Sequence, residues 1–299
     1  MPSLKAIRRR IASVKNTQKI TRAMKMVAAA RLRRAQQRIT DLRPYADKTR
    51  DVTQSVAGRA RGDEGVAPLH PLLQARPVET VLLVVFTSDR GLAGAFNSSI
   101  LRATDRRIRE LEESGKRVEL AVLGRKGRDY YRRRGATIRH DLVGAYEGGA
   151  TRAGEIARQF IADFSAEEGG VDEVVLVFNA FKSAISQVVT LQPVLPIVAD
   201  ATETGAGAGT RSLVDSIYEP SREVLLDRLL PMYVKVSMYR AMLESQASEH
   251  GSRMTAMDNA TNNAKKMIGS LTLEYNRARQ AAITKELMEI IGGAEALHD

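Results

Sequence analysis

The sequence has no cysteine, no long apolar run and almost no acidic residues among its first fifty positions. Without cysteine there can be no disulfide, thiolate metal site or cysteine nucleophile. No window approaches the run of about 18 apolar residues that a membrane-spanning helix needs, and the start of the chain lacks the apolar segment of a secretory signal. With 43% apolar and 27% charged residues, the chain can still bury a core. We therefore expect a soluble, cytoplasmic protein.

The scarcity of acidic residues makes the beginning of the chain strongly basic. Residues 1–50 contain 15 Lys and Arg but only Asp41 and Asp47, so this segment alone exceeds the +11 net charge of the whole chain. Three interpretations are open: a mitochondrial presequence, a nucleic-acid binder, or a rod held against an acidic protein partner. A presequence is shorter than this pattern, and nucleic-acid binding lacks interleaved aromatic residues here, so the third interpretation is favoured.

The basic segment is also predicted to be one long amphipathic helix. Glycine is absent before Gly58, and Ser3 is suited to cap the first free backbone amides. Apolar or small residues recur in steps of three and four, as in a coiled-coil seam that extends to about Val56, with a bend expected at Pro44. The seam consists of Leu4, Ile7, Ile11, Val14, Gln18, Thr21, Met24, Ala28, Leu32, Ala35, Ile39 and Leu42.

A second long helix is predicted from about Leu213 to Ile291, with breaks or kinks at Pro220 and Pro231 and a stop at Gly292 and Gly293. Its looser seam runs through Val234, Met238, Ala241, Ser245, Ser248, Ser252, Ala264, Met267, Leu271, Ala278, Ala282 and Leu287. Much of this seam is small or polar, so the helix needs a partner. The simplest arrangement pairs the two terminal helices as an antiparallel coiled coil, with the rest of the chain at one end of the rod.

The middle of the chain alternates apolar runs of strand length with helix-length segments, which predicts an α/β layer with a mostly parallel sheet. The expected strands are 80–87, 117–123, 137–142, 174–180 and 187–191, and the expected helices are 98–113, 125–134 and 151–166. The predicted domains are an N-terminal coiled-coil helix at 1–57, a globular α/β domain at 78–200 and a C-terminal coiled-coil helix at 212–292.

Motifs for chemistry are weak. The turn from Phe86 to Asn97 lies between a strand and a helix, where dinucleotides bind in some folds, but its Gly91-x-x-Gly94 spacing matches neither phosphate-binding motif. We favour a structural turn and keep a dinucleotide-dependent enzyme as the alternative. The four histidines are scattered without metal-ligand spacing, and adjacent carboxylates fit solvated helix surfaces. We therefore predict no catalytic, cofactor-binding or metal site.

Several longer motifs carry a family resemblance. IASVKNTQKITRAMKMVAA at 11–29, SRMTAMDNAT at 252–261, NRARQAAITKEL at 276–287 and EIIGGA at 289–294 resemble the gamma subunit of F-type ATP synthases. The Ser88-Asp-Arg-Gly-Leu92 turn matches as well, although Ala93 stands where many relatives have cysteine. The resemblance covers essentially the whole chain, in the expected order.

The resemblance implies a long antiparallel coiled coil of the terminal helices plus a central Rossmann-like α/β domain. It implies a central rotor shaft that couples proton-driven rotation of the membrane c-ring to ATP synthesis or hydrolysis. Expected partners are the alpha and beta subunits, the epsilon subunit and the c-ring, with no nucleic acid and no insertion into the membrane. The chain would be a non-catalytic, peripheral subunit on the cytoplasmic face of a bacterial cell membrane.

The same resemblance assigns contacts with the beta subunits to six residues by motif. These are Met24, Lys25, Arg253, Arg279, Gln280 and Thr284. The cysteine-bearing regulatory insertion of chloroplast relatives is missing, so a dithiol switch of that kind cannot operate.

Overall fold

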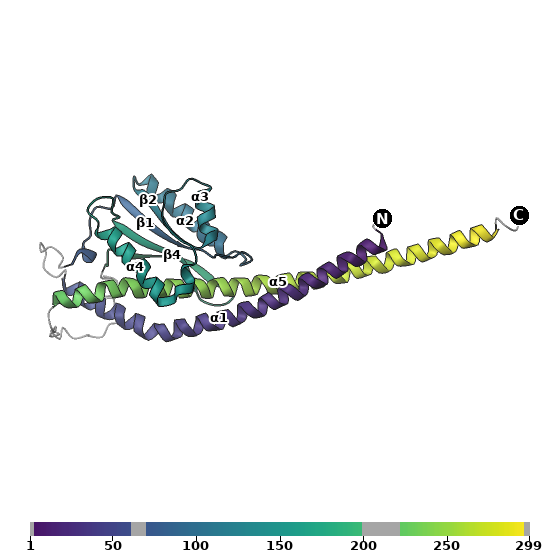
Figure 1. Cartoon of the computed structure of the whole chain (residues 1–299), viewed down its shortest axis with the longest axis horizontal. Helices are drawn as coiled ribbons and strands as arrows, with labels where there is room; N and C mark the ends of the chain where they lie inside the picture. Colours follow the sequence, from purple (N-terminus) through teal and green to yellow (C-terminus); the bar gives the residue numbers. More distant parts are fainter. Residues whose placement is uncertain (1–2, 61–69, 199–221, 296–299) are drawn as a thin grey trace, which may run out of the picture. The chain divides into compact units, whose positions relative to one another are not determined.

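The computed structural model describes residues 3–60, 70–198 and 222–295. The contacts within it divide the chain into two compact units. One, here called the two-helix unit, comprises residues 1–29 and 253–299, and the other, the α/β unit, comprises residues 30–252. Helices α1 (Leu4–Ala60) and α5 (Arg222–Glu295) each contribute to both units (Figure 1). The predicted combination of two long terminal helices with an α/β sheet domain is confirmed.

The ends of the long helices test the expected start and stop signals. Ser3 caps α1 as predicted, because its Oγ accepts a hydrogen bond of 3.3 Å from the Ala6 N–H. Both helices continue through their internal prolines, so the expected break at Pro231 does not occur, whereas Pro220 lies outside the described residues. The predicted stop at Gly292 and Gly293 is wrong, because α5 continues to Glu295. Glycine costs a helix only about 1 kcal/mol, so it weakens the last turns without ending them.

A five-stranded sheet in the order β3-β2-β1-β4-β5 forms the centre of the α/β unit. The first four strands along the chain run parallel and β5 pairs antiparallel with β4, which confirms the mostly parallel sheet. The strands are β1 Thr80–Phe86, β2 Arg117–Leu123, β3 Ile138–Leu142, β4 Glu173–Phe181 and β5 Gln187–Leu195. The remaining helices are α2 Phe96–Glu113, α3 Arg125–Arg132 and α4 Gly149–Ser165, with short 3-10 turns η1 Pro71–Leu73 and η2 Ala145–Gly148.

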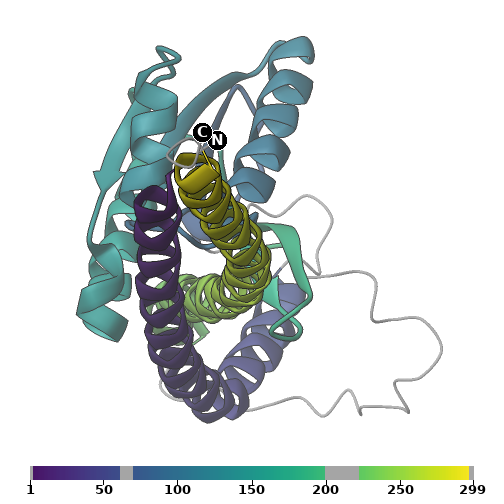
Figure 2. The same ribbon diagram turned by 90° about the vertical axis from the view of Figure 1, so that its right-hand side faces the viewer.

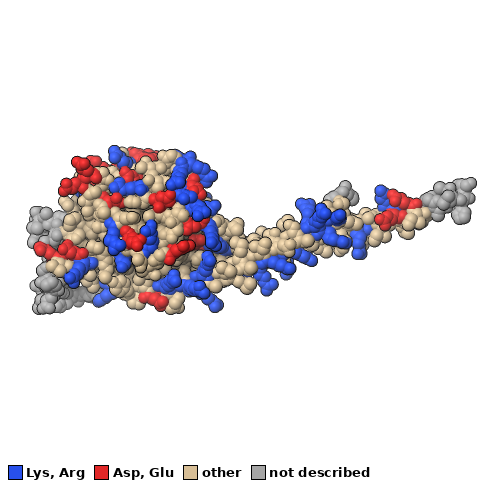
Figure 3. Space-filling view, viewed as in Figure 1, with Lys and Arg blue, Asp and Glu red and all other residues tan. Residues whose placement is uncertain are grey.

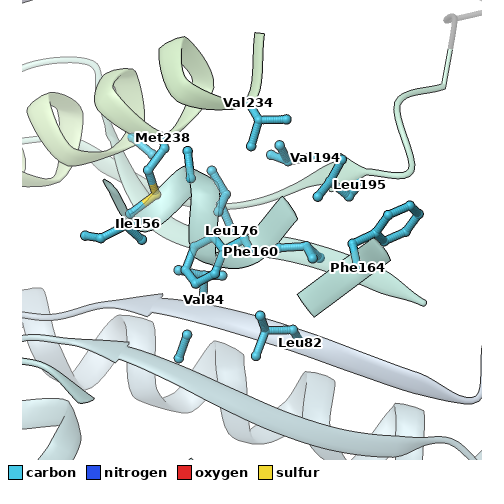
Figure 4. Packing of buried hydrophobic residues seen from close by; sticks show 14 of the residues in the cluster. Leu82, Val84, Ile156, Phe160, Phe164, Leu176, Val194, Leu195, Val234 and Met238 are labelled. Atoms are coloured by element: carbon cyan, nitrogen blue, oxygen red, sulfur yellow. The ribbon is translucent and has the colours of Figure 1, made fainter. Parts of the chain in front are cut away.

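Both faces of this sheet are covered, which explains the uninterrupted apolar run of β1. Val81, Leu83 and Val85 point to a cluster formed with α2 and α3. Leu82 and Val84 point the other way, to a cluster with α4 and the first part of α5 (Figure 4). Members of the second cluster include Ile156, Phe160, Phe164, Leu176, Val194, Val234 and Met238. The part of α5 that follows Arg222 is therefore a component of the α/β core.

The edge strand β5 is longer than predicted and contains Pro193. The sequence suggests that the strand ends near Leu191, yet it continues to Leu195. Proline has no N–H for a second neighbour, and β5 has a neighbour only on its β4 side. An edge position therefore accommodates Pro193, and the register shifts where Val174 and Val175 meet Leu195 and Pro193.

In the two-helix unit, α1 and α5 lie side by side and antiparallel (Figure 2). Every predicted seam position of α1 in this unit, from Leu4 to Ala28, is at least partly buried. The seam of α5 is partly corrected, because Met267 is 53% exposed whereas the neighbouring Ile268 is half-buried. From residue 262 to residue 291, the less exposed positions of α5 are Ala264, Ile268, Leu271, Tyr275, Ala278 and Ala282.

Candidate partner interface

Three polar contacts fix the register of the two-helix unit. An Arg8 guanidinium N–H donates to the Tyr275 hydroxyl at 2.7 Å, and the Thr21 and Thr261 hydroxyls lie 2.8 Å apart. The Lys25 ammonium donates to Asp258 Oδ1 at 2.6 Å. The residue numbers of each pair add to 282 or 283, as expected of two antiparallel helices without an insertion. Since α1 begins at Leu4, its last possible neighbour on α5 lies near Arg279.

The described end of α5, from residue 280 to residue 295, therefore extends beyond α1. Its large apolar side chains are exposed, with Ile283 at 55%, Met288 at 64% and Ile290 at 69%. Leu287 and Ile291 complete this set, which we call the apolar end of α5. The exposure of Leu287 corrects the predicted seam, because this residue has no α1 residue opposite it. A contiguous exposed apolar surface on a helix marks a site that another protein covers.

The six residues assigned to partner contact lie in different surroundings. Arg279, Gln280 and Thr284 are exposed next to the first residues of α1, where the apolar end of α5 begins. Met24 is half-buried, and Lys25 is already paired with Asp258. Arg253 is only 9% exposed. The structure thus brings three of the six together on an open surface and leaves their role as contacts a prediction.

Positive charge surrounds this surface. Between residues 3 and 29, α1 has eight Lys and Arg and no acidic residue, and all of these cations except Lys25 are exposed. On the face drawn in Figure 3, blue side chains are spread along the two-helix unit, whereas red ones appear only toward the end of α5. The α/β unit carries both signs intermixed. Eight of the 15 cations among residues 1–50 therefore lie in the two-helix unit, where α1 has no acidic residue to balance them.

The turn between β1 and α2 is held by buried polar contacts within the protein. Thr87 Oγ1 donates to the Leu123 carbonyl at 2.8 Å and accepts from the Gly127 N–H at 2.9 Å. The Ser88 N–H donates to Asn97 Oδ1 at 3.0 Å, and the Arg125 N–H donates to Asp89 Oδ1 at 3.0 Å. These groups stabilise the strand ends, which supports the structural interpretation of the turn.

Helix α5 occupies the crevice where folds of this class bind dinucleotides. That crevice lies at the carboxyl ends of the strands where the strand order reverses, here between β1 and β4. Ser252 Oγ donates to the Ala93 carbonyl at 2.6 Å, and Ser248 Oγ donates to the Asn179 carbonyl at 2.9 Å. Ala93 follows β1, and Asn179 belongs to the end of β4. The two serines, which in sequence looked like weak seam positions, therefore close this crevice.

Comparison with known proteins decides between the alternatives. The ATP synthase family profile matches residues 3–297. An ATP synthase gamma chain from Anaeromyxobacter sp. strain Fw109-5 is 53% identical over 99% of this chain and 100% of its own length. The gamma chain from Sorangium cellulosum is 50% identical over the whole length of both proteins. The chain belongs to the ATP synthase gamma-chain family.

Solved structures agree with this family. A chain from the central stalk and c-ring of the Tetrahymena thermophila mitochondrial ATP synthase is 28% identical, with a TM-score of 0.58 over 81% of this chain and 99% of that one. A chain from the Euglena gracilis mitochondrial ATP synthase is 20% identical and shares the fold, with a TM-score of 0.64 over 99% of this chain and 94% of that one. The gamma chain is the central stalk, or rotor shaft, of the synthase. The resemblance found in the sequence motifs is confirmed.

This gamma-family membership bears on the hypotheses left open by the sequence. Because the family match covers residues 3–297, it favours the rod held against a protein partner over the dinucleotide-dependent enzyme and the nucleic-acid binder. Among residues 3–60, 70–198 and 222–295, there is no cluster of three or more potential metal ligands. Over the same ranges, no helix is long and apolar enough to cross a membrane.

Proposed function

We propose that the two-helix unit turns inside a ring of alternating alpha and beta subunits and that the α/β unit meets the epsilon subunit and the membrane c-ring. The observation that carries this proposal is the apolar end of α5, which projects past α1 with five large side chains exposed. An exposed apolar helix end of this kind requires surrounding protein subunits to remove it from water. The Tetrahymena neighbour, whose title names a central stalk and c-ring, supports the same assignment.

In this mechanism the shaft performs no chemistry of its own. The three beta sites differ because each one faces a different side of an asymmetric rod. A rod can shift a site between binding, synthesis and release only if it binds those conformations with different free energies. The two-helix unit is asymmetric in the required way, since its α1 segment carries cations without any acidic residue, whereas its α5 segment carries both signs and alone has the apolar end.

The six residues assigned by motif would supply the specific contacts with the beta subunits. Arg279, Gln280 and Thr284 have the exposure that such contacts need, and the guanidinium of Arg279 can form forked hydrogen bonds to a carboxylate. Met24 and Lys25 would act lower on the shaft, with Lys25 free to exchange its Asp258 partner for an acidic residue of the ring. Long-range attraction between the basic α1 and acidic groups of the ring would favour assembly.

The proposed placement makes this chain a non-catalytic subunit, peripheral to the cytoplasmic face of a bacterial cell membrane. The division into coiled-coil helices at 1–57 and 212–292 and a globular α/β domain at 78–200 belongs to the same proposal. Protons would drive the c-ring, which turns the α/β domain and then the shaft. The beta subunits would carry out the ATP chemistry. This is consistent with the crevice of the sheet, which α5 occupies in place of a nucleotide.

The test is reconstitution with purified alpha and beta subunits. The triple replacement Ile283→Ser, Leu287→Ser and Ile290→Ser should reduce co-purification of the chain with the ring at least tenfold. Ile185→Ser is the matched control, because Ile185 is 86% exposed in the α/β unit. The proposal is wrong if the triple variant assembles as well as the control.

Rotation itself can be tested through a single introduced thiol, since the chain has no cysteine. Met24→Cys, crosslinked to a cysteine on a beta subunit, should stop ATP turnover, and reduction should restore it. Full turnover with the crosslink intact would rule out obligatory rotation at this level of the shaft.

A further inference from the structure

A stretch of α5 shorter than two turns is attached by side chains to three separate segments of the α/β unit. Ser252 and Ser248 reach the turn after β1 and the end of β4, at 2.6 and 2.9 Å. Two residues before Ser248, Gln246 Nε2 donates to the Tyr146 carbonyl at 3.2 Å, in η2. Nonpolar packing of α5 lies on the earlier stretch from Leu226 to Met242. The hydrogen-bonded stretch thus follows directly after the hydrophobic one.

The fit at this stretch depends on small residues. A Cβ on Gly251 would lie 3.3 Å from Ala184 Cα and 3.4 Å from the Phe181 ring. Ser248 is completely buried, and the Asn179 side chain continues the network by donating to the Phe96 carbonyl at 3.3 Å. The β1–α2 turn, β4 and α5 are therefore connected to one another at this point. We call Ser248, Gly251 and Ser252 the latch.

Hydrophobic packing and hydrogen bonds resist different motions. Apolar burial is non-directional, so it restricts the rotation angle of a helix less strictly than hydrogen bonds do. Hydrogen bonds require both a short distance and a suitable angle. A slip of one residue turns a helix by about 100°, which would break both serine contacts at once. The latch therefore defines the angle of α5 relative to the sheet.

We propose that Ser248 and Ser252 are positioning residues for energy coupling, because they prevent the α/β unit from slipping around α5 when torque passes between them. The inference rests on the proposed function, in which the c-ring acts on the α/β unit and the beta subunits act on the shaft. When the opposing torque is low, the apolar core is sufficient to hold the α/β unit against α5. When the opposing torque is high, the latch determines how much of the rotation of the α/β unit reaches the far end of the shaft.

The experiment uses the complete synthase in inverted membrane vesicles. ATP hydrolysis and ATP-driven proton uptake are measured together while an opposing proton gradient is increased. The double variant Ser248→Ala with Ser252→Ala should hydrolyse ATP within twofold of the native rate without a gradient. Its protons pumped per ATP should fall at least threefold against a steep gradient.

Two further variants distinguish positioning from simple stability. Ser252→Thr retains the hydroxyl at a partly exposed position and should restore the pumping ratio, while Ser270→Ala changes an exposed serine of the same helix and should alter nothing. Ser252→Ala alone should give an intermediate ratio if the double variant does not assemble. A loss of hydrolysis and pumping in equal proportion, or an unchanged ratio at high gradient, overturns the latch.

Failure of the underlying function would look different. If native vesicles depleted of this chain still pumped protons on ATP addition, the rotor assignment itself would be wrong. If only the native complex pumps, and the latch variants behave like it at every gradient, then the rotor assignment stands and the latch proposal fails.

Discussion

Replacing Thr87 by valine should destabilise the carboxyl ends of β1 and β2 by about 2 kcal/mol. Thr87 is completely buried, and valine keeps its shape but has no hydroxyl. The Gly127 N–H would lose its 2.9 Å acceptor, and an unsatisfied buried donor costs about 1–3 kcal/mol. The Leu123 carbonyl keeps its bond from the Thr87 N–H, so only one group becomes an orphan. The added methyl group returns up to about 0.8 kcal/mol, so the full penalty of about 3 kcal/mol expected at this completely buried position leaves a net loss of about 2 kcal/mol.

Thr87→Ser is the matched control, because it retains the hydroxyl and loses one methyl group, at a cost of about 1 kcal/mol. Hydrogen exchange of the full chain, followed by mass spectrometry of peptides that contain Gly127, measures the effect locally. A loss of about 2 kcal/mol corresponds to roughly 30-fold faster exchange in the valine variant. The serine variant should change the rate by roughly fivefold. If serine were as damaging as valine, packing rather than hydrogen bonding would be the cause.

Three other perturbations follow from local geometry. Gly124→Ala should cost at least about 3 kcal/mol and lower soluble yield, since Gly124 has φ +92° and its Cβ would lie 2.1 Å from the Thr87 carbonyl oxygen; an unchanged urea midpoint would contradict this. Asp258→Asn removes the ion pair with Lys25, and because both side chains are over 40% exposed, the coiled coil should lose less than about 1 kcal/mol, less still in 1 M salt, by thermal melting. Burial lowers the pKa of His70 below 6.5, outweighing the opposing effect of Asp227. The unfolded chain therefore binds a proton at His70 more readily than the folded chain does, so the stability from this group is complete above about pH 6.5 and falls on acidification. Urea titrations from pH 8 to 5 should show this decrease in stability, and His70→Gln should reduce it.

The neutral form of His70 also has a structural role that makes the direction of this pH effect understandable. Its Nδ1 accepts a 3.1 Å hydrogen bond from the Leu72 N–H and so caps η1. A protonated Nδ1 cannot accept that bond. Acidification therefore removes a cap as well as charging a half-buried ring.

Local patterns in the sequence were sufficient for most of the fold. The β2 strand was predicted at its observed bounds, because Arg117 to Leu123 is an apolar run between two clear helical segments. The α1 seam was also predicted, since each of its positions faces the interior of a regular coil. Gly292 misled the prediction because glycine ends a helix only where a left-handed turn follows. The predicted end of β5 near Leu191 was too early, since an edge strand can contain Pro193.

The candidate site was harder to predict, because it depends on pairings between distant parts of the chain. The register of α1 on α5 determines that Leu287 is exposed, although the seam pattern alone placed it inside. The roles of Ser248 and Ser252 depend on which carbonyls the folded sheet presents to them. A run of small polar residues in an otherwise apolar seam was the available signal, and it was interpreted as weak packing.

The composition of the two-helix unit has a consequence for biosynthesis. Its two segments are residues 1–29 and 253–299, so the first segment to leave the ribosome pairs with the last. At synthesis rates of about 5–20 residues per second, the apolar stripe of α1 waits roughly 10 to 50 seconds for its partner. The sheet strands, which lie between these segments, are complete well before that time. A chain that is terminated between Met242 and Arg253 would therefore contain the whole α/β core but could not form the two-helix unit, so formation of that unit reports that translation has passed Arg253.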